Sequence, residues 1–176
     1  MRILSALTAV SLCVGCSDTN HLNPGPTSPS SVPAVPSNVV ATYSATFTAS
    51  PSCAPSVSTN VMARSYSATL LTDGRIQWSA PTMHPPPGHS TVSNGSMSGD
   101  RFSFSLGLSH DIQSDAFNGI WDTLSASSSL TIEGKGDGMV QGTSITGAFD
   151  GPFVYYEGEQ VTGCFAADHR FTFMKQ

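Results

Sequence analysis

The sequence predicts an all-β fold, an eight-stranded antiparallel up-and-down barrel, and three observations lead to this prediction. From residue 39 onward, apolar and hydroxyl side chains alternate with period two in one segment after another, as in strands with one buried face. Glycines recur at alternate positions of one predicted strand, which is typical of a sheet that coils sharply. A cysteine pair lies where the first and last strands of a closed barrel would meet. A sandwich of two β-sheets is the alternative.

The first 15 residues have the organisation of a signal peptide. Residues 1–2 provide a basic start, and residues 3–14 form an apolar stretch of about a dozen residues. Such a stretch is too short to cross the roughly 30 Å hydrocarbon core of a bilayer as a helix, but it suits the apolar region of a signal peptide. The chain is therefore expected to be exported.

The apolar stretch ends in Val14-Gly15-Cys16. This tripeptide resembles the lipobox of bacterial lipoproteins, in which the cysteine is lipidated and becomes the new N-terminus. Cys13 stands where that family prefers leucine, so an ordinary secretory signal cleaved after Gly15 is the alternative. Several acyl chains on Cys16 would attach the protein stably to a membrane of the bacterial cell envelope. Because Ser17 rather than aspartate follows the cysteine, the resemblance favours the outer membrane.

Residues 16–38, which follow the signal peptide, are predicted to be the lipidated cysteine and a disordered tether. The segment is rich in serine and contains Pro24, Pro26, Pro29, Pro33 and Pro36. It has too few apolar side chains to offset the entropy lost on ordering. In an extended polyproline II form, at about 3.1 Å per residue, it would reach at most roughly 70 Å. Such a spacer would let an anchored domain clear the membrane surface.

The low charge of the chain excludes some partners. Charged residues make up 11 % of the sequence, the net charge is −5 at pH 7, and lysine and arginine never form a run. A surface of this kind has no electrostatic basis for binding nucleic acid or anionic lipid. The membrane is therefore expected as a partner only through the lipid anchor.

Residues 39–176 are expected to form the barrel domain. The predicted strands run over residues 41–49, 61–71, 76–78, 91–97, 102–108, 130–140, 145–153 and 164–174. Short turns, such as those at residues 73–74 and 98–100, make successive strands antiparallel neighbours. Closure removes exposed strand edges, which favours the barrel over the sandwich. Residues 111–124 lack the alternation and are expected to hold a helical turn or to plug or cover the barrel.

The predicted strand over residues 130–140 carries Gly134, Gly136 and Gly138 on its inner face. Glycine at successive inward positions relieves crowding where a sheet coils sharply, and this favours closure. The missing side chains are also expected to leave volume inside the barrel.

Two of the four cysteines are expected to form a disulfide. Cys13 leaves with the signal peptide and Cys16 is lipidated, so Cys53 and Cys164 remain as a pair in an oxidising compartment. Cys53 lies just past the first predicted strand, and Cys164 opens the last. In a closed antiparallel barrel these strands are neighbours that run in opposite directions, which brings the two residues within bonding reach. The alternative, a pair of metal or redox ligands, is disfavoured because no Cys-x-x-Cys motif occurs.

Four segments carry a family resemblance, namely residues 49–53, 64–69, 149–151 and 164–171. Together they resemble a group of uncharacterised bacterial lipoproteins over most of residues 41–174, and no activity comes with that resemblance. The predicted architecture is also loosely similar to the calycins (lipocalins and avidins), small meander barrels that bind ligands in their mouths. This chain departs from lipocalins, because the first strand has no Gly-x-Trp motif and Trp78 stands in the third.

The sequence contains no recognisable catalytic, cofactor-binding or metal-binding motif. A Gly-x-Ser-x-Gly elbow is missing, and His84 and His89 flank a proline run with no carboxylate or cysteine close in sequence. The neighbours Asp168 and His169 would point to opposite faces of a strand, so they do not form a dyad. We therefore expect a protein that is not an enzyme and has no cofactor or metal.

Two functions remain. The first is non-enzymatic binding of a small, mostly apolar ligand inside the barrel. Its expected lining is Tyr43, Trp78, Phe104, Gly134, Gly136 and His169. His169 is predicted to face inward with Phe165, Phe171 and Phe173, either as a core residue or as a polar anchor for the ligand. The second is a structural or protein-interaction domain of the cell envelope, with the barrel filled by side chains.

Overall fold

The computed structural model describes residues 38–54, 61–87, 89–107 and 119–176. The chain divides into two compact units, residues 1–34 and residues 35–176, and every described residue belongs to the second. The predicted signal peptide, Cys16 and nearly all of the tether lie outside the described residues. Among the residues that are described, none belongs to a helix long and apolar enough to cross a membrane.

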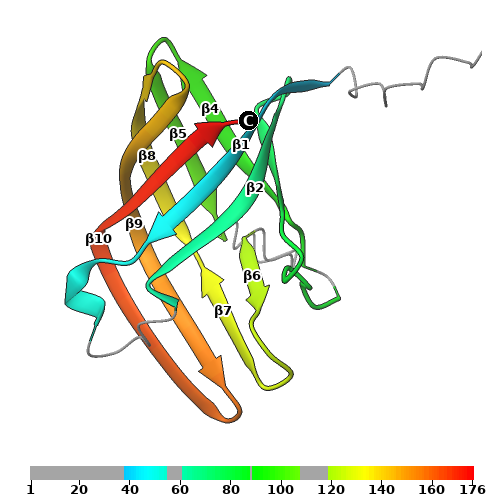
Figure 1. Cartoon of the computed structure of the whole chain (residues 1–176), viewed down its shortest axis with the longest axis vertical. Coiled ribbons are helices and arrows are strands. Elements are labelled where there is room, and N and C mark those ends of the chain that lie inside the picture. The colour runs from blue at the N-terminus through cyan, green and yellow to red at the C-terminus, as the bar shows by residue number, and fades with distance from the viewer. Residues whose placement is uncertain (1–37, 55–60, 88, 108–118) are drawn as a thin grey trace, which may run out of the picture. The chain divides into compact units, whose positions relative to one another are not determined.

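The described residues form ten strands and one short 3-10 helix (Figure 1). They are β1 (Val39–Thr48), η1 (Pro51–Cys53), β2 (Ala63–Leu71), β3 (Arg75–Ser79), β4 (Val92–Ser98), β5 (Arg101–Leu106), β6 (Ile120–Thr123), β7 (Ser128–Ile132), β8 (Gly134–Gln141), β9 (Ser144–Glu157) and β10 (Gln160–Lys175). Every strand pair is antiparallel, and the order β1-β2-β3-β4-β5-β8-β9-β10 closes because β10 also pairs with β1. The predicted eight-stranded meander barrel is confirmed, and the two-sheet sandwich is excluded.

Strand β1 shows how the alternating pattern produces the barrel wall. Ala45 and Phe47 are fully buried inside, whereas Thr46 and Thr48 point outward. The outward hydroxyls pair across strands, as where Thr46 Oγ1 lies 2.7 Å from Oγ of Ser65 on β2. The wall therefore has an apolar inner surface and a hydroxyl-rich outer one, as the period of two requires.

The predicted strand over residues 130–140 is in fact two strands, β7 and β8, separated by Glu133. Gly134 follows the break with a φ of +142°, and a Cβ there would lie 2.2 Å from the backbone oxygen of Asp150. Only glycine permits this approach of two backbones. Because of the break, β9 pairs first with β8 and then, farther along, with β7.

A four-stranded sheet, which we call the extension, continues beyond the barrel. It consists of β6, β7, residues 153–157 of β9 and residues 160–166 of β10. Strands β9 and β10, with 14 and 16 residues, are long enough to belong to both parts. The domain begins with β1 at one end of the barrel, and the extension lies at the other end (Figure 1). Strand β6 occupies residues 120–123, where a helical turn was expected, while residues 111–118 lie outside the described residues.

Strand β10 contains a β-bulge that overturns one prediction. Between the pairs of Ala166 with Gly151 and of His169 with Phe149, β10 has two residues and β9 has one. An extra residue reverses the face to which the preceding side chains point. His169 therefore faces inward as predicted, but Phe165 does not; its side chain points outward and is 73 % exposed.

Candidate functional site

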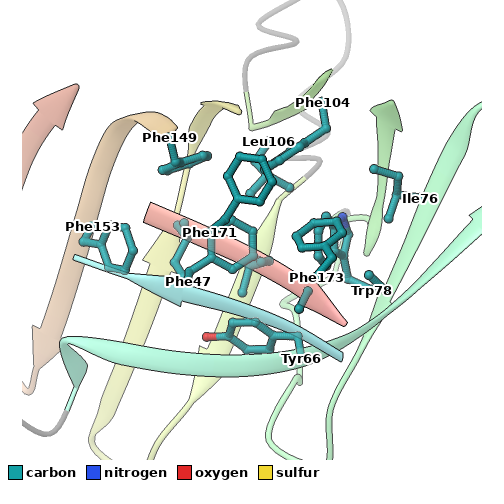
Figure 2. Packing of buried hydrophobic residues seen from close by; sticks show 14 of the residues in the cluster. Phe47, Tyr66, Ile76, Trp78, Phe104, Leu106, Phe149, Phe153, Phe171 and Phe173 are labelled. Carbon is teal, nitrogen blue, oxygen red and sulfur yellow. The ribbon is translucent and has the colours of Figure 1, made fainter. Parts of the chain in front are cut away.

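The interior of the barrel is filled by aromatic side chains (Figure 2). The ring of Phe47 lies 5.4–6.2 Å, centre to centre, from rings that include those of Trp78, Phe104, Phe149 and Phe173. These five side chains are at most 4 % exposed. The indole nitrogen of Trp78 donates a hydrogen bond of 2.7 Å to Oγ of Ser93. The packing is that of a core, with mainly edge-to-face and tilted ring contacts.

The residues expected to line a ligand cavity are part of this core. A Cβ on Gly136 would lie 2.2 Å from Cε1 of Phe104, so the ring of Phe104 occupies the space that the missing side chain leaves. At Gly134, the backbone of β9 occupies the space that a side chain would need. Tyr43 is half-buried at the margin, with its ring 6.1 Å from that of Phe173. These glycines therefore allow close packing inside the barrel. A hollow of about 400 Å³ that Phe104 and Gly136 also line lies on the outer surface, among Ser96, Ser103 and Lys135.

His169 is a buried residue whose two ring nitrogens both have partners. Its Nδ1 accepts a hydrogen bond of 2.8 Å from the backbone N–H of Ser50. Nδ1 is therefore unprotonated, and Nε2 donates to the backbone oxygen of Gly151 at 2.9 Å. The ring also packs against Phe153 at 4.6 Å between centres. Burial lowers the pKa of His169 below its ordinary 6.5, more than the bond to Gly151 raises it.

The lowered pKa of His169 predicts how stability depends on pH. The unfolded chain binds a proton on this residue near pH 6.5, before the folded chain does, so acid favours unfolding. We expect the free energy of unfolding to be level above about pH 7 and to fall as the pH drops below 6.5 through the folded pKa. Urea denaturation at a series of pH values measures this. A His169→Gln variant should lose much of the slope, whereas the parent slope in that variant would contradict the assignment.

The predicted disulfide is confirmed, since Cys53 is bonded to Cys164 with their Cα atoms 5.4 Å apart. It joins η1, just after β1, to the inner face of β10. The neighbouring hydrogen bond from Ser50 to His169 joins the same two segments. The end of the first strand is thus fixed to the last strand at the junction between the barrel and the extension.

An ion pair with a buried carboxylate and a partly exposed guanidinium, which has no counterpart in the sequence analysis, connects β2 to β6. The side chain of Asp122 is completely buried, and its Oδ2 accepts hydrogen bonds from Nε and Nη2 of Arg64 at 2.8 and 2.6 Å. The hydroxyl of Tyr66 donates to the same oxygen at 3.0 Å. Burial and the carboxylate both raise the pKa of Tyr66, which stays protonated as a donor. No sequence signal marks this pair, because its members are 58 residues apart and Asp122 follows a segment without a strand pattern.

The outer face of the extension carries apolar and aromatic side chains, some exposed and some half-buried. We call Trp121, Val154, Tyr156, Val161 and Phe165 the aromatic face. Val161 is 61 % exposed and Phe165 is 73 % exposed, the highest values among the large apolar side chains that are described as exposed. The rings of Trp121 and Tyr156 are nearly parallel, with an angle of 16° and centres 5.7 Å apart. Exposed apolar side chains beside half-buried aromatic rings are typical of a binding surface.

A shallow hollow of about 490 Å³ adjoins this face. Trp121 and Tyr156 line it together with Gly158 and hydroxyl residues of the β6–β7 hairpin. The hydroxyl residues are Thr123, Ser125, Ser127, Ser128 and Ser129. The backbone N–H of Gly158 donates to the oxygen of Ser127 at 2.8 Å, which fixes the two turns to each other. The hollow is therefore held by two connected hairpins.

The remaining candidate residues are not brought together. His84 is exposed, whereas the ring of His89 packs edge-on against Trp121, with 5.4 Å between centres. Asp168 lies exposed in the bulge of β10, and residues 110–111 lie outside the described residues. Within the part of the chain that the structure describes, no three His, Cys, Asp or Glu side chains are grouped so that they could hold a metal ion.

Comparison with known proteins finds no matching family model, curated protein or solved structure. The resemblance to bacterial lipoproteins therefore stays a prediction. The closed eight-stranded antiparallel barrel is compatible with a calycin-like architecture, but architecture alone does not assign a function.

Proposed function

We propose that the protein is a docking domain of the bacterial cell envelope, attached to a membrane through a lipid on Cys16. In this proposal the filled barrel is a rigid scaffold, and the aromatic face of the extension binds a partner protein. The observation that carries the proposal is the exposure of Phe165 and Val161 beside the parallel rings of Trp121 and Tyr156. Tryptophan, tyrosine and other large apolar side chains supply much of the energy of protein–protein binding.

The packing of the interior favours docking over binding of an apolar ligand inside the barrel. Phe104 covers Gly136, and Trp78 lies among phenylalanine rings. A ligand in this region would have to displace side chains that already bury one another. The buried titratable groups have structural partners, since His169 bonds to two backbone groups and Asp122 pairs with Arg64. This supports a role that uses the surface of the domain.

The position of the extension also supports docking. The domain starts at β1, and the extension lies at the opposite end of the barrel. The predicted tether of up to roughly 70 Å would join the domain at the β1 end, so the attachment itself would not cover the extension. A surface held there is accessible to other components of the envelope.

Photo-crosslinking in intact cells tests this proposal. With benzoylphenylalanine in place of Phe165, we expect discrete crosslinked adducts, because this side chain is the most exposed one of the aromatic face. Met174 is the matched control. It is also exposed (49 %), but it lies on the outer surface of the barrel and not on the aromatic face. Equal adducts at both positions, or none at Phe165, would contradict the docking face. A bound mass in native mass spectrometry that is lost on denaturation, without adducts at Phe165, would support the small-ligand alternative.

A further inference from the structure

The extension differs from the barrel in charge. The extension with its two turns, residues 120–132 and 153–166, contains no lysine, arginine or histidine. Its acidic residues are Asp122, Glu157 and Glu159. The described lysines and arginines all lie in barrel strands, at Arg64, Arg75, Arg101, Lys135, Arg170 and Lys175. Arg64 is already paired with Asp122. Glu157 and Glu159 thus give the far end of the extension a negative charge, and none of the described lysines and arginines belongs to the extension.

The two carboxylates at the far end lie beside the hollow. Glu157 and Glu159 are exposed and flank Gly158, which lines the hollow with Trp121 and Tyr156. At the other end of the aromatic face, Asp168 is exposed in the bulge just past Phe165 and lies two residues from Arg170. An apolar strip with negative charge beside the hollow attracts a partner that combines apolar and positive groups.

We infer that the aromatic face binds a basic segment of a partner protein in which arginine alternates with apolar side chains. This inference rests on the proposed docking function and names the chemistry of the partner. The apolar side chains of such a segment would cover Val161 and Phe165. A guanidinium group would lie in the hollow, since it stacks on tryptophan and tyrosine rings and its five N–H donors suit serine hydroxyls.

The charge distribution favours this partner over a glycan. A sugar ring would also stack on Trp121 and Tyr156 and bond to the hydroxyls of the hollow. A neutral glycan, however, would gain nothing from the carboxylates that flank Gly158 or from the lack of basic residues in the extension. A basic segment uses the rings, the hydroxyls and the charge together.

A peptide titration tests the inference. The probe is a fluorescein-labelled decapeptide of alternating arginine and leucine, titrated by anisotropy against the full chain in a nonionic detergent. We expect the parent to bind the peptide saturably at low salt and more weakly at about 0.3 M NaCl. The affinity should fall about tenfold in Glu157→Gln/Glu159→Gln and in Tyr156→Ser. The matched control is Asp100→Asn/Asp137→Asn, which removes two exposed carboxylates from the barrel and should bind within about twofold of the parent. Unchanged denaturation midpoints establish that the variants fold.

Three results would overturn the inference. They are equal binding of a peptide with glutamate in place of arginine, equal weakening in the barrel control, and binding of a chitin tetrasaccharide at this face without binding of the basic peptide. In the last case the occupant would be a glycan. Crosslinks at Phe165 would then still support the docking face, so failure of the inference is distinguishable from failure of the proposed function.

Discussion

Replacing both Cys53 and Cys164 by serine is expected to lower the free energy of unfolding by about 4–5 kcal/mol. The bond closes a segment with a sequence separation of 111, and opening a loop of that size restores much conformational entropy to the unfolded chain. It also joins η1 to β10 at the junction of barrel and extension, so both parts lose a common fixed point. Urea denaturation followed by far-ultraviolet circular dichroism measures the loss.

Two comparisons make the disulfide experiment specific. The parent protein treated with a reductant should approach the stability of the double serine variant, and the variant itself should not respond to reductant. The strand signal before unfolding should remain, because β1 and β10 still pair over Arg170 to Lys175. A variant as stable as the oxidised parent would show that the bond contributes little to the folded state.

The barrel was predictable because two independent patterns in the sequence agree. The alternation of side chains defines most strands, and closure of a meander brings the first and last strands together. That closure explains why the sequence alone was enough to pair Cys53 with Cys164. The prediction of the strands uses a local period, and the prediction of the disulfide uses the order of the strands. Neither prediction depends on the exact register between strands.

The aromatic face was missed because it depends on register. Within residues 164–174 the period-two pattern places Phe165 with His169 and Phe171, and nothing in the sequence marks the two residues of β10 that oppose one residue of β9. A single inserted residue moves every side chain before it to the other face. The extension itself depends on the break at Glu133 and on β6, which follows a segment without alternation.

Whether the space beside an inward glycine is filled also depends on which strands become neighbours. Gly136 was expected to leave free volume, but Phe104 lies directly opposite on β5 and its ring fills that volume. The pairing of β5 with β8 skips the β6–β7 hairpin, and alternation along each strand does not reveal such a skip. Sequence therefore predicted the inward glycines correctly but not what packs against them.

Replacing Arg64 by leucine is expected to lower the free energy of unfolding by about 3 kcal/mol or more at pH 7. The variant leaves the carboxylate of Asp122 fully buried, with the hydroxyl of Tyr66 as its remaining described donor. An uncompensated buried charge is more destabilising than the loss of the pair as a whole. The double variant Arg64→Leu/Asp122→Leu should therefore be more stable than Arg64→Leu alone. Equilibrium denaturation of the parent, the two single variants and the double variant measures this difference.

The same ion pair has a consequence for the proposed docking face. Asp122 fixes β6 from the inner side, and its neighbour Trp121 points to the outer face of the same strand. Loss of the pair should loosen β6 and weaken binding of the arginine–leucine peptide even at temperatures where the barrel stays folded. In the double variant, where leucine packs in place of the pair, peptide binding should recover in part. If Arg64→Leu and the double variant are equally stable and bind the peptide like the parent, the pair neither stabilises the domain nor positions Trp121.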